Sequence, residues 1–115
     1  RLVRTVCPHC KIPSKMNGEY MKELGVDEET LAKACLRVGE GCEKCLDTGY
    51  YGRTGIYEMM KMTELIDKTI LSTSDANVIK QVAIENGLKT LRHDGTNKVM
   101  LGVSTTEEIL RVTQV

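Results

Sequence analysis

The chain has 115 residues, enough for one modest hydrophobic core, or for one core and a small unit held by something other than apolar burial. Its 16 basic and 16 acidic side chains cancel, which argues against a partner recognised mainly by charge, such as duplex DNA or an anionic membrane. Phe and Trp are absent, so aliphatic residues, methionines and 4 tyrosines must do the packing.

The amino end reads RLVRTV, which is neither a signal sequence nor a spanning segment, and the apolar runs elsewhere are short. We therefore expect a soluble protein with no direct membrane insertion. Because the chain begins with Arg1 rather than Met, we also expect a piece of a longer polypeptide. Residues 1–6 suit a short strand, and the segment YGRTGIYEMM, residues 51–60, suits a second one.

Two cysteine pairs of equal spacing lie between these predicted strands, in TVCPHCKIP and GCEKCLDTG. Disulfide bonds are disfavoured, because 5 cysteines is an odd number and no signal sequence points to an oxidising compartment. C-P-H-C also occurs in oxidising thioredoxin-like proteins. Pro13 would interrupt the helix that such proteins need there, and Pro8 and Pro13 are the only prolines available for their cis-proline loop.

A metal site explains both pairs together, because two C-x2-C turns from separate strands can complete a tetrahedral four-thiolate site, usually occupied by zinc. The predicted ligands are Cys7, Cys10, Cys42 and Cys45. Gly41 and Gly49 flank the second pair, where tight turns need backbone conformations that glycine adopts. Four thiolates leave no open coordination position, so we expect a structural zinc, with an iron–sulfur cluster as the alternative occupant.

The other conspicuous side chains favour structural interpretations. Cys35 is expected to be a small buried thiol on the apolar side of a helix. His9 is expected to face solvent, and His93 to lie on a helix surface. Three methionines are expected to fill the core: Met59, Met60 and Met62.

Helical signals occupy the rest of the chain. Two short helices are predicted inside the metal loop, over residues 17–25 and 27–39. Four more are predicted over residues 63–71, 74–87, 90–102 and 105–113, with Thr63 and Ser74 capping the first two. Gly95 would let a neighbouring helix approach, and Thr105 with Glu108 forms a capping box. The short links between these helices predict a bundle.

Together the elements predict an α+β fold. A small tetracysteine zinc-binding module, bracketed by two short strands, would precede a compact bundle of about four short helices. We expect the domain division to follow this order: residues 1–60 as the zinc-binding module with its flanking strands, and residues 61–115 as a C-terminal helical domain.

The motif order CPHC, GCEKC, TGYYGRTGIYE and GLKTLRHDGTNKVMLGVSTTEEILRVT resembles the carboxyl-terminal part of the ATPases of type II secretion and type IV pilus assembly. The resemblance covers essentially the whole chain, and its tetracysteine motif matches Cys7, Cys10, Cys42 and Cys45. It implies a cytoplasmic hexameric parent with a RecA-like nucleotide core. The phosphate loop G-x4-G-K-[ST] is absent from these residues, so ATP and Mg²⁺ are expected only in the parent, with the fragment inactive alone.

The resemblance further implies an interaction role, peripheral to the inner membrane, with neighbouring ATPase subunits and an inner-membrane platform protein as partners. It leaves open whether the parent serves secretion or pilus assembly. Arg53 or Glu58 would contribute to a subunit or nucleotide-proximal contact. Alternatively, their segment is an edge strand of a larger sheet, which the apolar Ile56 and Met60 favour.

A second function class is a free-standing zinc module that binds nucleic acid or unfolded polypeptide. Nucleic-acid binding is disfavoured, because the chain lacks a basic surplus and stacking aromatic residues. The chaperone repeat C-x2-C-x-G-x-G also fails to match, because Leu46, Asp47 and Thr48 separate Cys45 from the next glycine.

Overall fold

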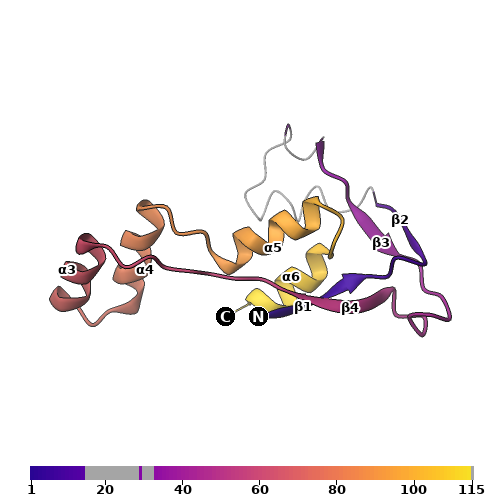
Figure 1. The fold of residues 1–115 in the computed structure, drawn as a ribbon, viewed down its shortest axis with the longest axis horizontal. Coiled ribbons are helices and arrows are strands. Elements are labelled where there is room, and N and C mark those ends of the chain that lie inside the picture. Colours follow the sequence, from indigo (N-terminus) through magenta and orange to yellow (C-terminus); the bar gives the residue numbers. More distant parts are fainter. Residues whose placement is uncertain (15–28, 30–32, 115) are drawn as a thin grey trace. The chain divides into compact units, whose positions relative to one another are not determined.

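The computed structural model describes residues 1–14, 29 and 33–114 (Figure 1). Its elements are β1 (Leu2–Val6), β2 (Lys11–Pro13), β3 (Arg37–Gly39), β4 (Tyr50–Gly55), α3 (Glu64–Ser72), α4 (Ala76–Glu85), α5 (Leu91–Met100) and α6 (Thr106–Thr113). The α+β prediction is confirmed: the described residues form four helices and two short antiparallel sheets, and a cluster of cysteines lies between the strands.

The first sheet joins the two strands that were expected to bracket the cysteines. β1 pairs with β4 in antiparallel register, from Leu2 opposite Gly55 to Val6 opposite Tyr50. β4 ends at Gly55, before the apolar residues that were expected to extend this strand to residue 60. A bulge lies within the pairing, where Gly52 has a φ of 84° that favours glycine.

The second sheet is a ribbon of β2 and β3, with Lys11 opposite Gly39 and Pro13 opposite Arg37. The helix predicted over residues 27–39 is therefore wrong at its carboxyl end, where β3 forms. A cross-strand pair of Ile12 and Val38 explains the difference, because β-branched side chains pack well across a ribbon. The remaining parts of the helices predicted at 17–25 and 27–39 lie mostly outside the described residues.

The hydrophobic core of one compact unit is built from both ends of the chain. This unit comprises Arg1–Ile56 and Leu91–Val115. In it α6 packs against both α5 and β1 (Figure 1). The buried core cluster consists of Val3, Ile56, Val99 and Ile109. The sheet that leads into the cysteines is therefore backed by the terminal helices.

Gly95 permits the close approach of α5 and α6, as predicted. A Cβ atom at Gly95 would lie 2.7 Å from Cγ2 of Ile109, inside normal contact distance. Half of the expected capping box is also confirmed, because the Thr105 hydroxyl accepts from the Glu108 N–H at 3.2 Å. The Glu108 side chain, however, hydrogen-bonds to Arg4 and Arg111.

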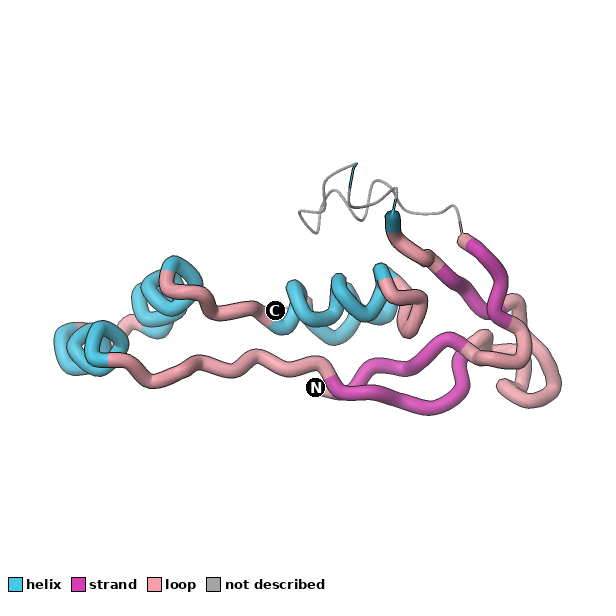
Figure 2. Tube along the Cα trace, turned by 45° about the horizontal axis from the view of Figure 1, so that its top comes forward, coloured by secondary structure: helices cyan, strands magenta, loops and turns pink. Residues whose placement is uncertain are grey.

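The other compact unit comprises Tyr57–Thr90 and contains the adjacent helices α3 and α4 (Figure 2). Thr63 caps α3 as predicted, since its side chain accepts from the Ile66 N–H. The cap of α4 is Asp75 and not the expected Ser74, because the Asp75 carboxylate accepts from the N–H of Asn77.

The methionines expected in the core are exposed. Met59 is 83% and Met62 60% exposed, and Met60 is 39% exposed. They precede α3 in a segment without helix or strand. Among the described residues of this unit only Ile66 and Ala83 are buried, so the pair of helices has little interior for these side chains to fill.

The expected division into residues 1–60 and 61–115 remains a proposal about domains. The contacts between residues divide the chain differently. Helices α5 and α6 belong to the same compact unit as β1, while α3 and α4 belong to the other unit. Within the part of the chain that the structure describes, no helix has both the length and the apolar character needed to cross a membrane.

Candidate metal centre

Each cysteine pair lies in a turn that connects the two sheets. Cys7 follows β1 directly and Cys10 immediately precedes β2. Cys42 and Cys45 lie between β3 and β4. The turns meet because the backbone N–H of Cys7 donates to the carbonyl of Gly49 at 2.9 Å, which joins the first turn to the start of β4.

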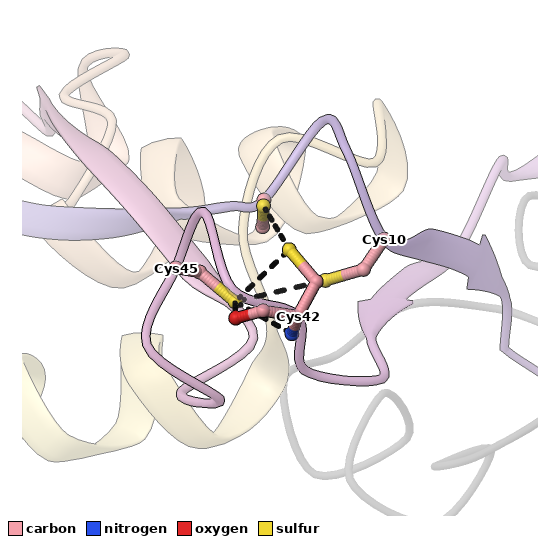
Figure 3. Close-up of side chains that lie close together, drawn as sticks. Cys10, Cys42 and Cys45 are labelled. Atoms are coloured by element: carbon pink, nitrogen blue, oxygen red, sulfur yellow. Dashed lines mark hydrogen bonds between the residues drawn. The ribbon is translucent and has the colours of Figure 1, made fainter.

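The sulfur atoms of Cys7, Cys10, Cys42 and Cys45 form one cluster. All lie within 4.8 Å of one another. The Sγ–Sγ distances are 3.8 Å for Cys7–Cys42, 3.8 Å for Cys10–Cys45 and 3.7 Å for Cys42–Cys45. Figure 3 shows the contacts that the sulfurs of Cys10 and Cys42 make with Cys45 Sγ, drawn as dashed lines. Four sulfurs at about 2.3 Å from one zinc ion would be about 3.8 Å apart. The arrangement could therefore bind one metal ion.

A disulfide does not account for this cluster. All five cysteines are free, and the sulfur separations are well above the roughly 2.05 Å of an S–S bond. The donor set is four thiols, which suits zinc or iron more than magnesium or calcium. Since all four positions of a tetrahedron would be filled by protein, the site offers no position for activating water.

Backbone N–H groups surround the sulfurs unequally. Cys45 Sγ accepts from the N–H of Cys42 at 3.2 Å and from that of Gly49 at 3.3 Å. Cys10 Sγ accepts from the N–H of Gly41 at 3.3 Å. Gly41 and Gly49 both have positive φ angles, 101° and 81°, which fits the turn role predicted for them.

Two thiols of the cluster have pKa values shifted in opposite directions. Burial raises the pKa of the Cys10 thiol to about 12, assisted by the neighbouring thiols and opposed by the N–H of Gly41. Burial also opposes ionisation of Cys45, but the N–H groups of Gly49 and Cys42 outweigh it and lower the pKa of Cys45 to about 6. The N–H groups of Gly49 and Cys42 thus stabilise a negative charge on Cys45 Sγ.

Among the described residues, the other histidines and cysteines are not part of the sulfur cluster. His9 is exposed, as predicted, with its ring edge-on to Tyr51 at 5.9 Å, and His93 is exposed on α5. The prediction for Cys35 is wrong, because its thiol is exposed. Cys35 lies outside any helix or strand, so it has no apolar helix face on which to be buried, and its N–H donates to the carbonyl of Met100 at the end of α5. The residue contacts the helix through its main chain.

Arg53 and Glu58 are also distinct from the metal centre. Arg53 is exposed on β4, opposite Arg4 in the register. Glu58 lies in the other unit, where its carboxylate is 3.7 Å from the Lys80 ammonium. Such an exposed pair contributes little to stability.

A polar cluster beside the core was missed by the sequence reasoning. The Glu108 carboxylate pairs with the guanidinium of Arg4 at 3.0 Å and also with that of Arg111. The Arg4 guanidinium lies 4.2 Å from the centre of the Tyr50 ring, and the Tyr50 hydroxyl meets the Thr105 hydroxyl at 2.7 Å. The Glu108–Arg111 spacing was the only signal available, because Arg4 is distant in the sequence.

Comparison with known proteins gives one family and a set of longer relatives. The model of the family described as "Type II/IV secretion system protein" matches residues 1–111. The chain is 43% identical to the type IV pilus assembly ATPase PilB of Thermus thermophilus, over 96% of this chain and 12% of that protein. It is 37% identical to type II secretion system protein E of Aeromonas hydrophila, over 99% of this chain and 22% of that protein.

A third relative, the type IV pilus assembly ATPase TfpB of Acinetobacter baylyi, is 38% identical over 97% of this chain and 19% of its own length. The chain therefore spans only about an eighth to a fifth of the length of these relatives.

Proposed function

The chain belongs to the type II/IV secretion system protein family, and we propose that it is a non-catalytic, zinc-braced part of a secretion or pilus-assembly ATPase. The clustering of the four sulfurs within 4.8 Å of one another is the observation that carries the zinc-braced part of this proposal. Similarity to relatives from both systems leaves the branch open between pilus assembly and type II secretion.

Cys7, Cys10, Cys42 and Cys45 would hold the ion. When bound, it would supply four bonds that close two turns, with no reactive position left over. The protein's own part is to aim the thiols, through turns anchored in both sheets, and to donate N–H groups to Cys10 and Cys45. The role of the centre is therefore structural: the bound ion would stabilise the two turns that connect the β1–β4 sheet to the β2–β3 ribbon.

We further propose that nucleotide chemistry belongs to the parent protein. The two pilus-assembly relatives are named as ATPases, yet the phosphate-loop sequence is absent from these 115 residues. ATP and Mg²⁺ would thus bind elsewhere in a hexameric cytoplasmic parent. This part would offer a docking surface to neighbouring subunits or to the inner-membrane platform protein, which would hold it peripheral to the inner membrane.

Elemental analysis of the purified chain tests the metal assignment directly. We expect one zinc per chain, retained through gel filtration and lost together with ordered β2–β3 resonances after treatment with a strong chelator. A folded chain free of metal would overturn the assignment, and two or more irons with acid-labile sulfide would replace zinc by a cluster. The same preparation should show no ATP hydrolysis.

A further inference from the structure

Gly49 hydrogen-bonds to both cysteine turns. Its N–H donates to Cys45 Sγ at 3.3 Å, in the second turn. Its carbonyl accepts from the N–H of Cys7 at 2.9 Å, in the first turn. A single peptide segment with a φ of 81° therefore contacts both halves of the metal centre, one through a sulfur and one through the backbone.

The same glycine lies against the end of the β2–β3 ribbon. A Cβ atom at Gly39 would lie only 2.1 Å from the Gly49 carbonyl oxygen, and a Cβ at Gly49 would lie 2.6 Å from the Gly39 oxygen. No side chain fits on either residue unless the backbone moves. This contact joins the last residue of β3 to the residue before β4.

We propose that Gly49 is the positioning residue of the metal centre and that Gly39, which donates nothing to a sulfur, controls metal affinity by holding Gly49 in place. The inference rests on the proposed metal site. Its physical basis is that the N–H of Gly49 neutralises part of the charge on Cys45 Sγ, as outer-shell donors do for metal ligands. Displacing Gly49 would weaken that donation and separate the two turns.

Alanine variants of the full chain separate this contact from backbone strain alone. Gly39→Ala and Gly49→Ala should each lower zinc affinity about 10- to 100-fold, measured by competition with a chromophoric chelator. Gly52→Ala is the nearby control, with a φ of 84° but only the Thr5 hydroxyl near its Cβ position. Gly87→Ala is the remote control, with a φ of 100° and no atom within 4 Å. Both controls should keep wild-type affinity.

A measurement on the unaltered chain avoids variants that fail to fold. In the chain loaded with ¹¹³Cd, a spin-½ nucleus couples through an N–H···S bond to the amide proton. We expect cadmium-coupled amides at Gly49, Cys42 and Gly41, the residues whose N–H groups donate to sulfur. The cobalt-substituted chain should in addition shift its ligand-field bands in Gly39→Ala, although residue 39 is no ligand.

The outcomes distinguish this inference from the function on which it rests. A chain that binds neither cadmium nor zinc refutes the metal site, and the inference with it. A chain that binds metal but shows no cadmium coupling at Gly49 refutes the inference alone. The same holds if Gly52→Ala costs as much affinity as Gly49→Ala, or if Gly39→Ala costs none.

Discussion

The backbone N–H of Arg4, in β1, donates to the side-chain carboxylate of Glu108, in α6, at 3.0 Å. The Arg4 guanidinium donates to the same carboxylate, at 3.0 Å to its second oxygen. One side chain of the last helix thus satisfies a backbone donor on the outer edge of the first strand. Since the Ser104 hydroxyl donates to the Arg4 carbonyl, that edge of β1 is closed to further pairing at this residue.

Replacing Glu108 by Gln should lower the free energy of unfolding by about 2 kcal/mol at pH 7. The Glu108 side chain is 1% exposed, but the side chains of Arg4 and Arg111 are 46% and 58% exposed, so solvent screens part of the attraction. The measurement is urea unfolding of the metal-loaded wild type and variant. Glu107→Gln, an exposed neighbour in the same helical turn, should change stability by less than about 0.5 kcal/mol.

The stabilisation by Glu108 should depend on pH. Although burial opposes ionisation, the hydrogen bonds from Arg111 and Arg4 lower the pKa of Glu108 to about 2, from its usual 4.5. Because the folded pKa is the lower one, the contribution is complete above about pH 4.5 and disappears as the pH falls toward 2. The stability difference between wild type and Glu108→Gln should shrink over this range. A difference that grows on acidification would contradict the assignment.

Gly95→Ala should destabilise the chain by about 1 kcal/mol, even though alanine favours a helix. The added methyl would meet Ile109 at 2.7 Å, and the resulting strain exceeds the gain in helix propensity. In Gly95→Ala/Ile109→Val part of the clash is removed, so the two substitutions should cost less together than their sum. Asn97→Ala, on the exposed side of α5, should not destabilise. Thermal unfolding of Gly95→Ala, Ile109→Val, the double variant and Asn97→Ala measures these changes in stability.

Cys42→Ser should abolish stoichiometric zinc binding, whereas Cys35→Ser should retain it. Cys42 lies in the sulfur cluster, and Cys35 has an exposed thiol outside it. In NMR spectra of Cys42→Ser we expect the amide peaks of residues 7–13 and 37–49 to lose dispersion, because the turns are no longer closed. Peaks of α3 and α4, in the other compact unit, should persist. Collapse of both sets together would contradict this separation.

Thr105→Ala should cost about 2 kcal/mol, more than either Thr63→Ala or Tyr50→Phe at about 1 kcal/mol each. Thr105 both caps α6 and meets the Tyr50 hydroxyl at 2.7 Å, while Thr63 caps α3 by accepting from the Ile66 N–H. Phenylalanine at position 50 keeps the ring under Arg4 and removes only the hydroxyl. Chemical unfolding gives the three values, and equal costs for Thr105→Ala and Thr63→Ala would leave the Tyr50 contact without energetic weight.

Short sequence patterns correctly predicted those features of the fold that are determined by residues close together in the sequence. The strand at residues 2–6, the caps at Thr63 and Thr105, and the small residue at Gly95 all follow from short-range chemistry. The cysteine cluster was predictable for a related reason, since two equal C-x2-C turns have few structural uses. Each of these signals occupies only a few residues and needs no knowledge of the fold.

Predictions that depended on distant partners were less successful. Residues 37–39 were predicted to end a helix, but they form β3 because they pair with β2, which is distant in the sequence. Cys35 looked buried because its neighbours are apolar, but its main chain contacts α5 and its thiol faces solvent. The methionines before α3 looked like core residues by composition, and their exposure is decided by packing that composition does not describe.

By itself the sequence determined the chemistry of this chain: its four-thiol donor set, its capped helices and the absence of a phosphate loop. Only the tertiary structure decided which parts share a core, placing α5 and α6 with β1, and set Glu108 against Arg4 and Gly39 against Gly49. The physical reason is range. A ligand or a cap is chosen by residues a few positions apart, whereas a close contact between distant segments exists only once the chain has folded them together.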